Sequence, residues 1–452
     1  MADVEYYDRE VETLSRERLK ELQFRKLHGM MEKIFASNRF YQQKFREASV
    51  ALSDIRSIED LARLPMTEKR ELEQDQMKNP IFGTNLTEPE EHYIQYHQTT
   101  GTTGKPLKFL DTRESWEWRA RVAGHILKGA GVRREDRVLF TFNFGPYTAF
   151  WVLYEGAYRL GALVMPTGGW QSEQRLQMLV ENRATVIPTT PTYAVRLAEA
   201  AAREGIDIVN SSVRILILTG EPGGLDPYVR NKVEGLWGAR CFDYIGMTEV
   251  GTWGFQCTEE PCGIHVIESE FIPEVVDPQT GAPVPEGEMG ELVLTNLGRA
   301  CMPAVRYRTG DLVKIKKSST CACGRTGRVL DGGVLGRKDE MIVIRAVNVF
   351  PSHLLSVVER FIEPGDEYLV EVYRKVDTNE IRIKLELKDE TRFASLSCAI
   401  QDEVRKKLNL RIEVLKVEKG DIPRSDYKTK RFVDRRKEVG QGDPAKDRQG
   451  CR

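Results

Sequence analysis

A repeated alternation of short apolar runs and helical patterns is the feature that most constrains the fold of this chain. The strand-like runs are 138–142, 162–165, 185–188 and 213–218, and the helical patterns that alternate with them are 116–128, 147–160 and 192–204. Each run is about as long as one buried strand, and each helical pattern is long enough to cross back over a sheet. Strands joined by crossover helices favour parallel pairing. The sequence therefore predicts an α/β sheet with crossover helices.

The rest of the chain divides into segments of different composition. Apolar spacing at 11–47 and 58–64 predicts helices, and Gly- and Pro-punctuated runs from Phe271 onward predict a β-rich lobe. After Gly336, three strand patterns and two helix patterns predict a small α+β domain. We therefore expect a large N-terminal domain at 1–335, a small C-terminal domain at 336–436 and a disordered polar tail at 437–452.

Charge and cysteine content exclude several classes of protein. Sixty-seven Lys and Arg balance sixty-eight Asp and Glu, so no global basic field favours nucleic acid or anionic membrane as a partner. Apolar runs stay well below the roughly 18 residues that a membrane span needs, and we place the chain in the cytoplasm. Eight cysteines are few for a disulfide scaffold, and four of them form two close pairs, Cys257/Cys262 and Cys321/Cys323. This pairing favours metal binding over disulfides.

A Thr- and Gly-rich octapeptide at 99–106 has the composition of a phosphate loop. Hydroxyls, flexible glycines and one ammonium group suit phosphate oxygens, which backbone N–H groups can surround. The predicted ATP-binding residues are Thr99, Thr100, Gly101, Thr102, Thr103, Gly104 and Lys105. Only two residues separate the glycines, and Pro106 replaces the Ser/Thr that would bind magnesium, so this is not a Walker A loop. Taken alone, the octapeptide also fits an ordinary polar β-turn.

Further motifs follow in order along the chain. They are YIGMTE at 244–249, YRTGDL at 307–312, GRKDEM at 336–341 continuing into 344–351, and PRSDYK at 423–428. Together with the octapeptide they resemble the motifs of the adenylate-forming superfamily of acyl-CoA synthetases, most closely its phenylacetate-CoA ligase branch. The resemblance spans about residues 90 to 436. It implies a large adenylation domain and a small, mobile C-terminal domain that rotates at Asp339 after adenylation.

The resemblance also implies a reaction. An aromatic carboxylate, of the phenylacetate or benzoate type, attacks ATP in the presence of Mg²⁺ to give an acyl-adenylate, and the thiol of CoA then captures the acyl group. Ala346 stands where the family tends to have glycine near the tunnel for CoA, so a carrier-protein thiol, an amine or a hydroxyl remains an alternative acceptor. A nucleotide sensor or a zinc-stapled interaction module is a third interpretation. The oligomeric state stays open, with a homodimer among the alternatives.

Two residues carry the catalytic assignment that the resemblance implies. A cation must offset the charge that develops on the α-phosphate, and a carboxylate must hold magnesium. These roles fall to Lys428 and Glu249. Lys430 is the second candidate for the cation, because Tyr427 replaces the glycine that usually precedes the family lysine.

The resemblance also implies the nucleotide contacts. Asp311 would accept hydrogen bonds from the ribose hydroxyls, although the local pattern equally fits a turn cap. The other predicted ATP or AMP contacts are Gly220, Glu221, Pro222, Tyr244, Ile245, Gly246, Met247, Thr248 and Arg337. Ile245 replaces the tyrosine that stacks on adenine in the family. Tyr244 need not take over that role, because adjacent side chains in a strand face opposite ways.

Two side-chain clusters complete the expectations. The family resemblance implies a structural zinc ion on Cys257, His265, Cys321 and Cys323, with Cys262 able to replace either of the first two, and ordinary reduced thiols are the alternative. Phe142, Phe144 and Tyr147 lie where the family builds its aryl pocket, although aromatic side chains at this spacing are equally typical of a core.

Overall fold

The chain divides into two compact units, Met1–Asp339 and Glu340–Arg452, here called the first and second units. The computed structural model describes residues 4–99, 106–221, 223–260, 263–317, 321–338, 342–344, 347–375, 378–408, 410–423 and 431–436. Gly336, where the sequence places the domain boundary, lies within the last strand of the first unit.

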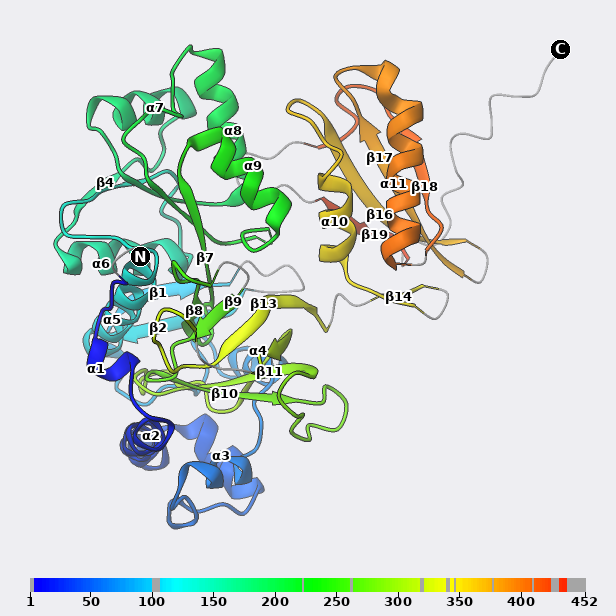
Figure 1. The fold of residues 1–452 in the computed structure, drawn as a ribbon. Helices are drawn as coiled ribbons and strands as arrows, with labels where there is room; N and C mark the ends of the chain where they lie inside the picture. The colour runs from blue at the N-terminus through cyan, green and yellow to red at the C-terminus, as the bar shows by residue number, and fades with distance from the viewer. Residues whose placement is uncertain are drawn as a thin grey trace. The chain divides into compact units, whose positions relative to one another are not determined.

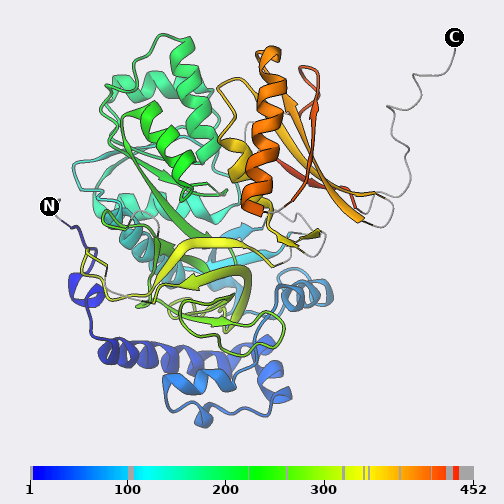
Figure 2. The ribbon, with the colours of Figure 1, turned by 45° about the vertical axis from the view of Figure 1, so that its right-hand side comes forward.

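The first unit begins with helices. These are α1 (Arg9–Glu12), α2 (Arg16–Ser37), α3 (Arg39–Glu47), η1 (Leu52–Asp54), η2 (Ile58–Arg63), α4 (Lys69–Lys78) and η3 (Glu90–His92). The Asn38 side chain accepts a hydrogen bond from the Tyr41 amide, so this residue ends α2 and begins α3. The buried face of α2, which includes Leu27 and Met31, packs in one cluster with Phe45. Figure 2 shows α2 lying along the antiparallel strands of the first unit.

Among the described residues, eleven strands form one mixed sheet, in the order β10-β11-β12-β13-β9-β8-β7-β6-β5-β3-β4. The parallel strands are β3 (Arg137–Phe140), β4 (Leu163–Pro166), β5 (Val186–Thr189), β6 (Ile215–Leu218) and β7 (Arg240–Met247). The antiparallel strands are β8 (Gly251–Phe255), β9 (Gly263–Val266), β10 (Phe271–Val276), β11 (Met289–Asn296), β12 (Tyr307–Ile315) and β13 (Val329–Arg337). A separate hairpin pairs β1 (Tyr93–Gln98) with β2 (Lys108–Thr112).

Helices cover both faces of the parallel strands (Figure 1). They are α5 (Arg113–Gly129), α6 (Thr148–Leu160), α7 (Ser172–Glu181), α8 (Pro191–Arg203) and α9 (Pro227–Trp237). Strand β6 shows the division, because Ile215 and Ile217 belong to the core of α5 and α6, whereas Leu216 and Leu218 belong to the core of α7, α8 and α9. Alternate side chains of a strand point to opposite faces, so a strand covered on both sides is apolar throughout. The predicted α/β sheet with crossover helices is confirmed.

Strand β7 joins the two kinds of pairing. It pairs in parallel with β6 on one side and antiparallel with β8 on the other. The β-rich part that the sequence predicts is therefore continuous with the α/β sheet. Since β7 and β8 are separated by only the turn 248–250, the chain reverses direction there and the sheet continues without a break.

The second unit is a smaller α+β fold. Its elements are β14 (Ile342–Ile344), β15 (Val347–Val349), α10 (Pro351–Glu359), β16 (Glu367–Lys375), β17 (Thr378–Glu386), η4 (Glu390–Arg392), α11 (Phe393–Leu408), β18 (Glu413–Lys416) and β19 (Phe432–Asp434). Four of its strands form a sheet in the order β18-β17-β16-β19, and Val358 and Ile400 from the two helices pack against it. Within the described part of the chain, no helix is both long and apolar enough to cross a membrane.

Candidate active site

The strand order gives the sheet a switch point at the carboxyl ends of its parallel strands. Strand β3 lies between β4 and β5, so the chain leaves β3 toward one side of the sheet and later returns on the other. Ligands of open α/β sheets commonly bind at such a switch point. The loop after β3 carries the predicted aryl-pocket residues, and the loop after β6 carries the predicted adenine-side turn.

The loop after β3 is rich in aromatic side chains. Phe142 is buried in the core and stacks on Phe150, whereas Phe144 and Tyr147 are half-buried. The Phe144 ring lies 4.6 Å from the Trp151 ring, whose Nε1 donates a hydrogen bond to the Gly145 carbonyl at 2.9 Å. Phe142 therefore belongs to the core that the sequence offered as the alternative, and Phe144 and Tyr147 retain accessible aromatic surface.

Hydrogen bonds between Thr99 and Leu107 join the two ends of the predicted phosphate loop. Thr99 donates its amide hydrogen to the Leu107 carbonyl at 2.9 Å, and the Thr99 hydroxyl accepts a hydrogen bond from the Leu107 amide at 3.0 Å. The Gln98 amide donates to the Pro146 carbonyl at 2.9 Å. The base of the phosphate loop is thus bonded to the aromatic loop after β3. Residues 100–105, which include the other six predicted phosphate contacts, lie outside the described residues.

The predicted adenine-side turn contacts β7. The Thr219 hydroxyl donates to the Tyr244 carbonyl at 3.1 Å, and Gly220 follows with a φ of 88°, a conformation that favours glycine. Glu221 accepts a hydrogen bond from the Thr192 amide at 2.6 Å, near the start of α8. Pro222 lies outside the described residues.

Tyr244 and Ile245 face opposite sides of β7. The Tyr244 side chain is buried in the core, and its hydroxyl donates to the Ala149 carbonyl at 3.3 Å. Burial, the largest influence on it, raises the pKa of this phenol above its usual value. Ile245 is half-buried and Gly246 is exposed. Ile245 packs at the edge of the core that contains Tyr244 and keeps part of its side chain exposed, whereas the Tyr244 side chain is fully enclosed.

Glu249 lies in the tight turn between β7 and β8, directly after Met247 and Thr248. Its side chain is 9% exposed, and the Lys69 ammonium group of α4 lies 3.7 Å from its carboxylate. Carboxylate oxygens are preferred ligands of Mg²⁺, so the residue fits the role that the sequence gives it.

Asp311 and Arg337 form an ion pair between neighbouring strands. The Arg337 guanidinium donates to the Asp311 carboxylate at 3.0 Å across the β12–β13 pair. Gly310 precedes them with a φ of 76°, and a Cβ atom there would lie 2.8 Å from Arg337 Nη2. Glycine thus permits the approach that brings two predicted nucleotide contacts together.

Four predicted metal ligands converge. One ligand atom each from Cys257, His265, Cys321 and Cys323 lies within 4.8 Å of the other three, and all four residues are buried. The Cys257 and Cys321 sulfur atoms are 3.6 Å apart, and Cys323 Sγ lies 3.5 Å from His265 Nε2. A tetrahedral zinc ion places two thiolates about 3.8 Å apart, and a thiolate and an imidazole nitrogen about 3.6 Å apart. The cluster therefore has the size and donor set of a structural zinc site.

The amino-terminal segment packs over this cluster. Tyr6 donates its hydroxyl hydrogen to the Cys323 carbonyl at 2.5 Å, and its ring lies 4.7 Å from the Arg325 guanidinium. Arg325 also donates to the Glu12 carboxylate at 2.5 Å. Residues before the first helix of the chain are thus fixed by the turn that carries two of the cysteines.

Several predicted site residues cannot be placed. Lys428, its alternative Lys430, the hinge residue Asp339, Ala346 and Cys262 all lie outside the described residues. Their roles stay predictions.

A buried ionic group next to Glu249 escaped the sequence analysis. Asp111, Arg119 and Arg299 are each at most 2% exposed, and the Asp111 carboxylate accepts hydrogen bonds from both guanidinium groups at 3.0 and 2.7 Å. Burial alone would raise the pKa of the Asp111 carboxyl, but the two guanidinium charges outweigh it and lower that pKa. The sequence gives one sign of this group, since the charged Arg119 stands among the apolar residues Trp116, Trp118 and Ala120 of α5.

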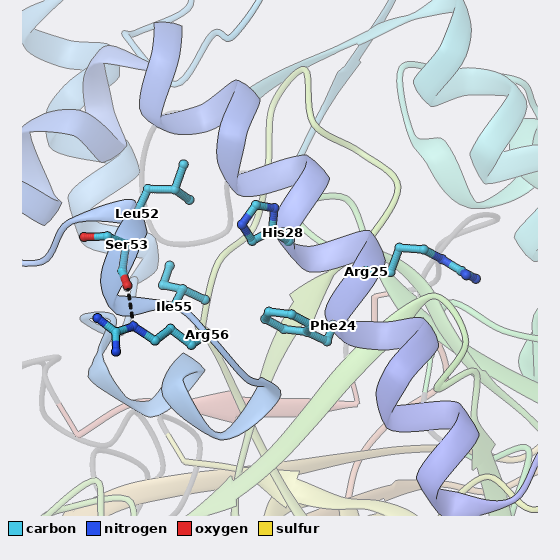
Figure 3. Close-up of a pocket in the computed structure, with 7 residues that line it drawn as sticks. All are labelled: Phe24, Arg25, His28, Leu52, Ser53, Ile55 and Arg56. Carbon is cyan, nitrogen blue, oxygen red and sulfur yellow. Dashed lines mark hydrogen bonds between the residues drawn. The ribbon is translucent and has the colours of Figure 1, made fainter.

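The structure also contains an open hollow of about 720 Å³ between α2 and η1. Figure 3 shows its lining residues Phe24, Arg25, His28, Leu52, Ser53, Ile55 and Arg56. None of them is a predicted site residue, so this hollow is distinct from the predicted site.

Comparison with known families decides between the interpretations of the motifs. Residues 20–300 match the model of the AMP-binding enzyme family, and residues 346–436 match that of the AMP-binding enzyme C-terminal domain. The chain belongs to the AMP-binding enzyme family. The chain is 33% identical over 452 residues to the phenylacetate-coenzyme A ligase of Thermus thermophilus, covering 95% of this chain and 100% of that protein. It is 32% identical over 439 residues to the phenylacetate-coenzyme A ligase of Escherichia coli, covering 95% and 98% of the two chains.

Solved structures show the same fold. A 2-hydroxyisobutyryl-CoA ligase in the postadenylation state, in complex with 2-HIB-AMP, superposes with a TM-score of 0.89 at 27% identity over 97% of this chain and 94% of that chain. The same enzyme in complex with 2-HIB-AMP and CoA in the thioesterification state has a TM-score of 0.73 at 28% identity, over 96% and 93% of the two chains.

These findings confirm the predicted family, fold class and reaction class. The chain is an ATP-dependent, AMP-forming acid–CoA ligase, which forms an acyl-adenylate and then transfers the acyl group to CoA. The sensor and the interaction module, the two non-enzymatic interpretations, are thereby set aside.

Proposed function

We propose that the acid is aromatic, of the phenylacetate or substituted benzoate type. The observation that carries this proposal is the hydrogen bond from Gln98 to Pro146, which joins the base of the predicted phosphate loop to the loop that holds Phe144 and Tyr147. An acid seated against these half-buried rings would have its carboxylate beside the phosphate loop. Aromatic rings suit a planar acid, since they offer a large contact area with a preferred stacking geometry. The phenylacetate-coenzyme A ligase relatives support the same acid class.

Each predicted site residue has a separate role in adenylation. The acid carboxylate attacks the α-phosphorus of ATP, the bond to the β-phosphate oxygen breaks, and pyrophosphate leaves. In this proposal Asp311 accepts hydrogen bonds from the ribose and Ile245 contacts adenine. Glu249 would hold Mg²⁺, which offsets charge on the phosphates. Lys428 would stabilise the charge that develops on the α-phosphate.

In the second step the CoA thiol attacks the acyl carbonyl and AMP leaves. Ala346 stands in the sequence where the family tends to have glycine, and its methyl group would narrow the path for the pantetheine arm. A carrier protein is a second proposed partner beside CoA, and a homodimer is the proposed assembly.

We further assign a structural zinc ion to Cys257, His265, Cys321 and Cys323. The cluster supplies four N or S ligands, which leaves no coordination position for a substrate. The ion would join the end of β8, strand β9 and the turn before β13. Nδ1 of His265 is buried without a hydrogen-bond partner in the described part of the chain, so Nε2 is the nitrogen that faces the cluster.

Acid-dependent exchange of labelled pyrophosphate into ATP tests the acid class. Phenylacetate and benzoates should support exchange at lower concentration than aliphatic acids, including 2-hydroxyisobutyrate, and CoA should then yield the thioester. Phe144→Leu should raise the KM for phenylacetate about fivefold, as loss of an aromatic contact predicts, without changing the KM for ATP. Phe361→Leu, a half-buried phenylalanine of the second unit, is the matched control. Preference for an aliphatic acid together with an unchanged Phe144→Leu variant would contradict the aromatic assignment.

A further inference from the structure

The turn that carries Glu249 depends on side chains from elsewhere in the chain. Thr248, Glu249 and Val250 form the connection between β7 and β8, where the ladder of strand hydrogen bonds is interrupted. Their carbonyl groups need other donors, because a buried carbonyl without a partner is costly. Three buried side chains supply those donors.

Each carbonyl of the turn accepts one hydrogen bond. Arg119 Nη2 donates to the Thr248 carbonyl at 3.2 Å, and Arg299 Nη1 donates to the Glu249 carbonyl at 3.0 Å. Asn296 Nδ2 donates to the Val250 carbonyl at 3.1 Å. Arg119 comes from α5, and Asn296 and Arg299 come from the end of β11 and the loop directly after it, so two distant parts of the chain hold one three-residue turn.

Asp111 fixes the two guanidinium groups. Its carboxylate accepts from the Nε atoms of Arg119 and Arg299, and the remaining Arg299 nitrogen donates to the Leu110 carbonyl at 3.1 Å. Arg299 has 0% exposure and its guanidinium lies 5.5 Å from the Phe109 ring centre. All three nitrogen atoms of the planar Arg299 guanidinium are hydrogen-bonded, which fixes its orientation. This orientation in turn fixes the position of the Glu249 backbone carbonyl.

The loop that carries Arg299 can approach because of a glycine. A Cβ atom at Gly298 would lie 2.1 Å from the Trp118 ring, on the helix that also carries Arg119. The two arginines therefore converge on Asp111 through a contact that a larger residue at position 298 would prevent.

We propose that Arg299, with Arg119, Asn296 and Asp111, positions the Glu249 carboxylate for Mg²⁺·ATP. This inference rests on the proposed role of Glu249 as the magnesium ligand. None of the four side chains touches substrate. They act by holding the turn, so that the Glu249 carboxylate is in place before the metal binds. Binding then loses no conformational entropy for ordering the turn.

Binding of α,β-methylene-ATP, which cannot release pyrophosphate, tests this inference without turnover. Isothermal titration with Mg²⁺ and with EDTA gives two dissociation constants, and their ratio measures how much the metal strengthens nucleotide binding. Arg299→Lys keeps the charge but loses the fork, and we expect it to reduce this ratio about tenfold, as for one hydrogen bond to a charged group. Asn296→Ala removes a neutral hydrogen bond and should reduce the ratio about threefold. This second variant still tests the inference if Arg299→Lys does not fold.

Two matched variants separate positioning from loss of stability. Arg306 is also buried and bonds one carboxylate, Glu274, and two carbonyls, those of Ala62 and Leu64, none of which belongs to the turn. Asn85 is buried and donates to the Pro303 carbonyl at 3.2 Å. Arg306→Lys and Asn85→Ala should lower the melting temperature comparably while leaving the ratio unchanged.

The outcomes distinguish the positioning role of Arg299 and Asn296 from the assignment of Glu249 as the magnesium ligand. Glu249→Gln should itself abolish most of the magnesium effect, and an unchanged ratio in that variant would remove Glu249 as the metal ligand. If Glu249→Gln responds but Arg299→Lys and Asn296→Ala bind as the native protein does, the positioning inference is wrong. An equal reduction in Arg306→Lys would also overturn it, because the effect would then report general loosening.

Discussion

Removing the zinc ligands tests how much one metal ion contributes to the first unit. Replacing Cys321 and Cys323 together by serine leaves Cys257 and His265, and two ligands do not hold zinc tightly. We expect the native protein, prepared without added metal, to contain about one zinc per chain by elemental analysis, and the double variant to contain none.

The magnitude follows from the loop that the ion closes. Cys257 and Cys321 are 64 residues apart in sequence and have sulfur atoms 3.6 Å apart. A cross-link that closes a loop of this length removes chain entropy worth about 4 kcal/mol at 25 °C. Unfolding entropy of about 2.1 cal/mol/K per residue gives the first unit, Met1–Asp339, about 0.7 kcal/mol/K, so its melting temperature should fall by about 6 °C.

Tryptophan fluorescence is a suitable probe of melting. All six tryptophans lie in the first unit, so the signal reports that unit and no other. Cys241→Ser is the matched control, because Cys241 is also fully buried but is not one of the four clustered residues. This variant should keep its zinc, and a zinc-selective chelator should destabilise it as it destabilises the native protein.

The chelator also supplies the refuting result. It should lower the melting temperature of the native protein toward that of Cys321→Ser/Cys323→Ser and have no further effect on the double variant. Native protein that is free of zinc and equally stable with chelator would make the three cysteines ordinary reduced thiols and His265 an ordinary buried histidine. A chelator effect of equal size in the double variant would show that the metal binds elsewhere.

Three further predictions concern catalysis and pH. Lys428→Ala should slow acid-dependent pyrophosphate exchange by a factor on the order of 100 or more while sparing thioester formation from supplied acyl-adenylate, and a larger defect in Lys430→Ala would transfer the role. Ala346→Gly should raise the apparent affinity for CoA about tenfold in steady-state kinetics without changing pyrophosphate exchange; efficient native kinetics with no gain would remove the argument for another acceptor. His97 is buried, and burial, followed by the charge of Arg119, lowers its pKa to about 4. Because the unfolded state, with a pKa of about 6.5, binds the proton first as pH falls, His97 should cost about 2 kcal/mol of stability between pH 7.5 and pH 5. Urea unfolding followed by tryptophan fluorescence should show that His97→Phe loses correspondingly less stability over that range, and equal losses in both proteins would mean that His97 is not buried in its neutral form.

Local patterns in the sequence are sufficient for much of the architecture. Strands β3, β4, β5 and β6 lie within a few residues of the apolar runs. For β5 and β6 the reason is that a strand buried on both faces must be apolar at consecutive positions. The opposite orientation of Tyr244 and Ile245 also follows from the sequence alone, since neighbouring side chains of a strand always alternate. Both properties depend on residues close together in the chain.

Tertiary structure decides which distant residues meet. Spacing leaves open whether Cys257 and Cys321 are neighbours, and only the pairing of β13 with β9 brings the two cysteine-bearing turns together. Asp111 and Arg299 look like ordinary surface charges in the sequence, because charged residues are usually solvated, and the apolar neighbours of Arg119 indicate its burial but not which groups it meets. Burial at the point where β2, α5 and the loop after β11 converge turns them into one ionic group. Long-range contacts of this kind depend on the register and packing of whole elements, and no short stretch of sequence contains that information.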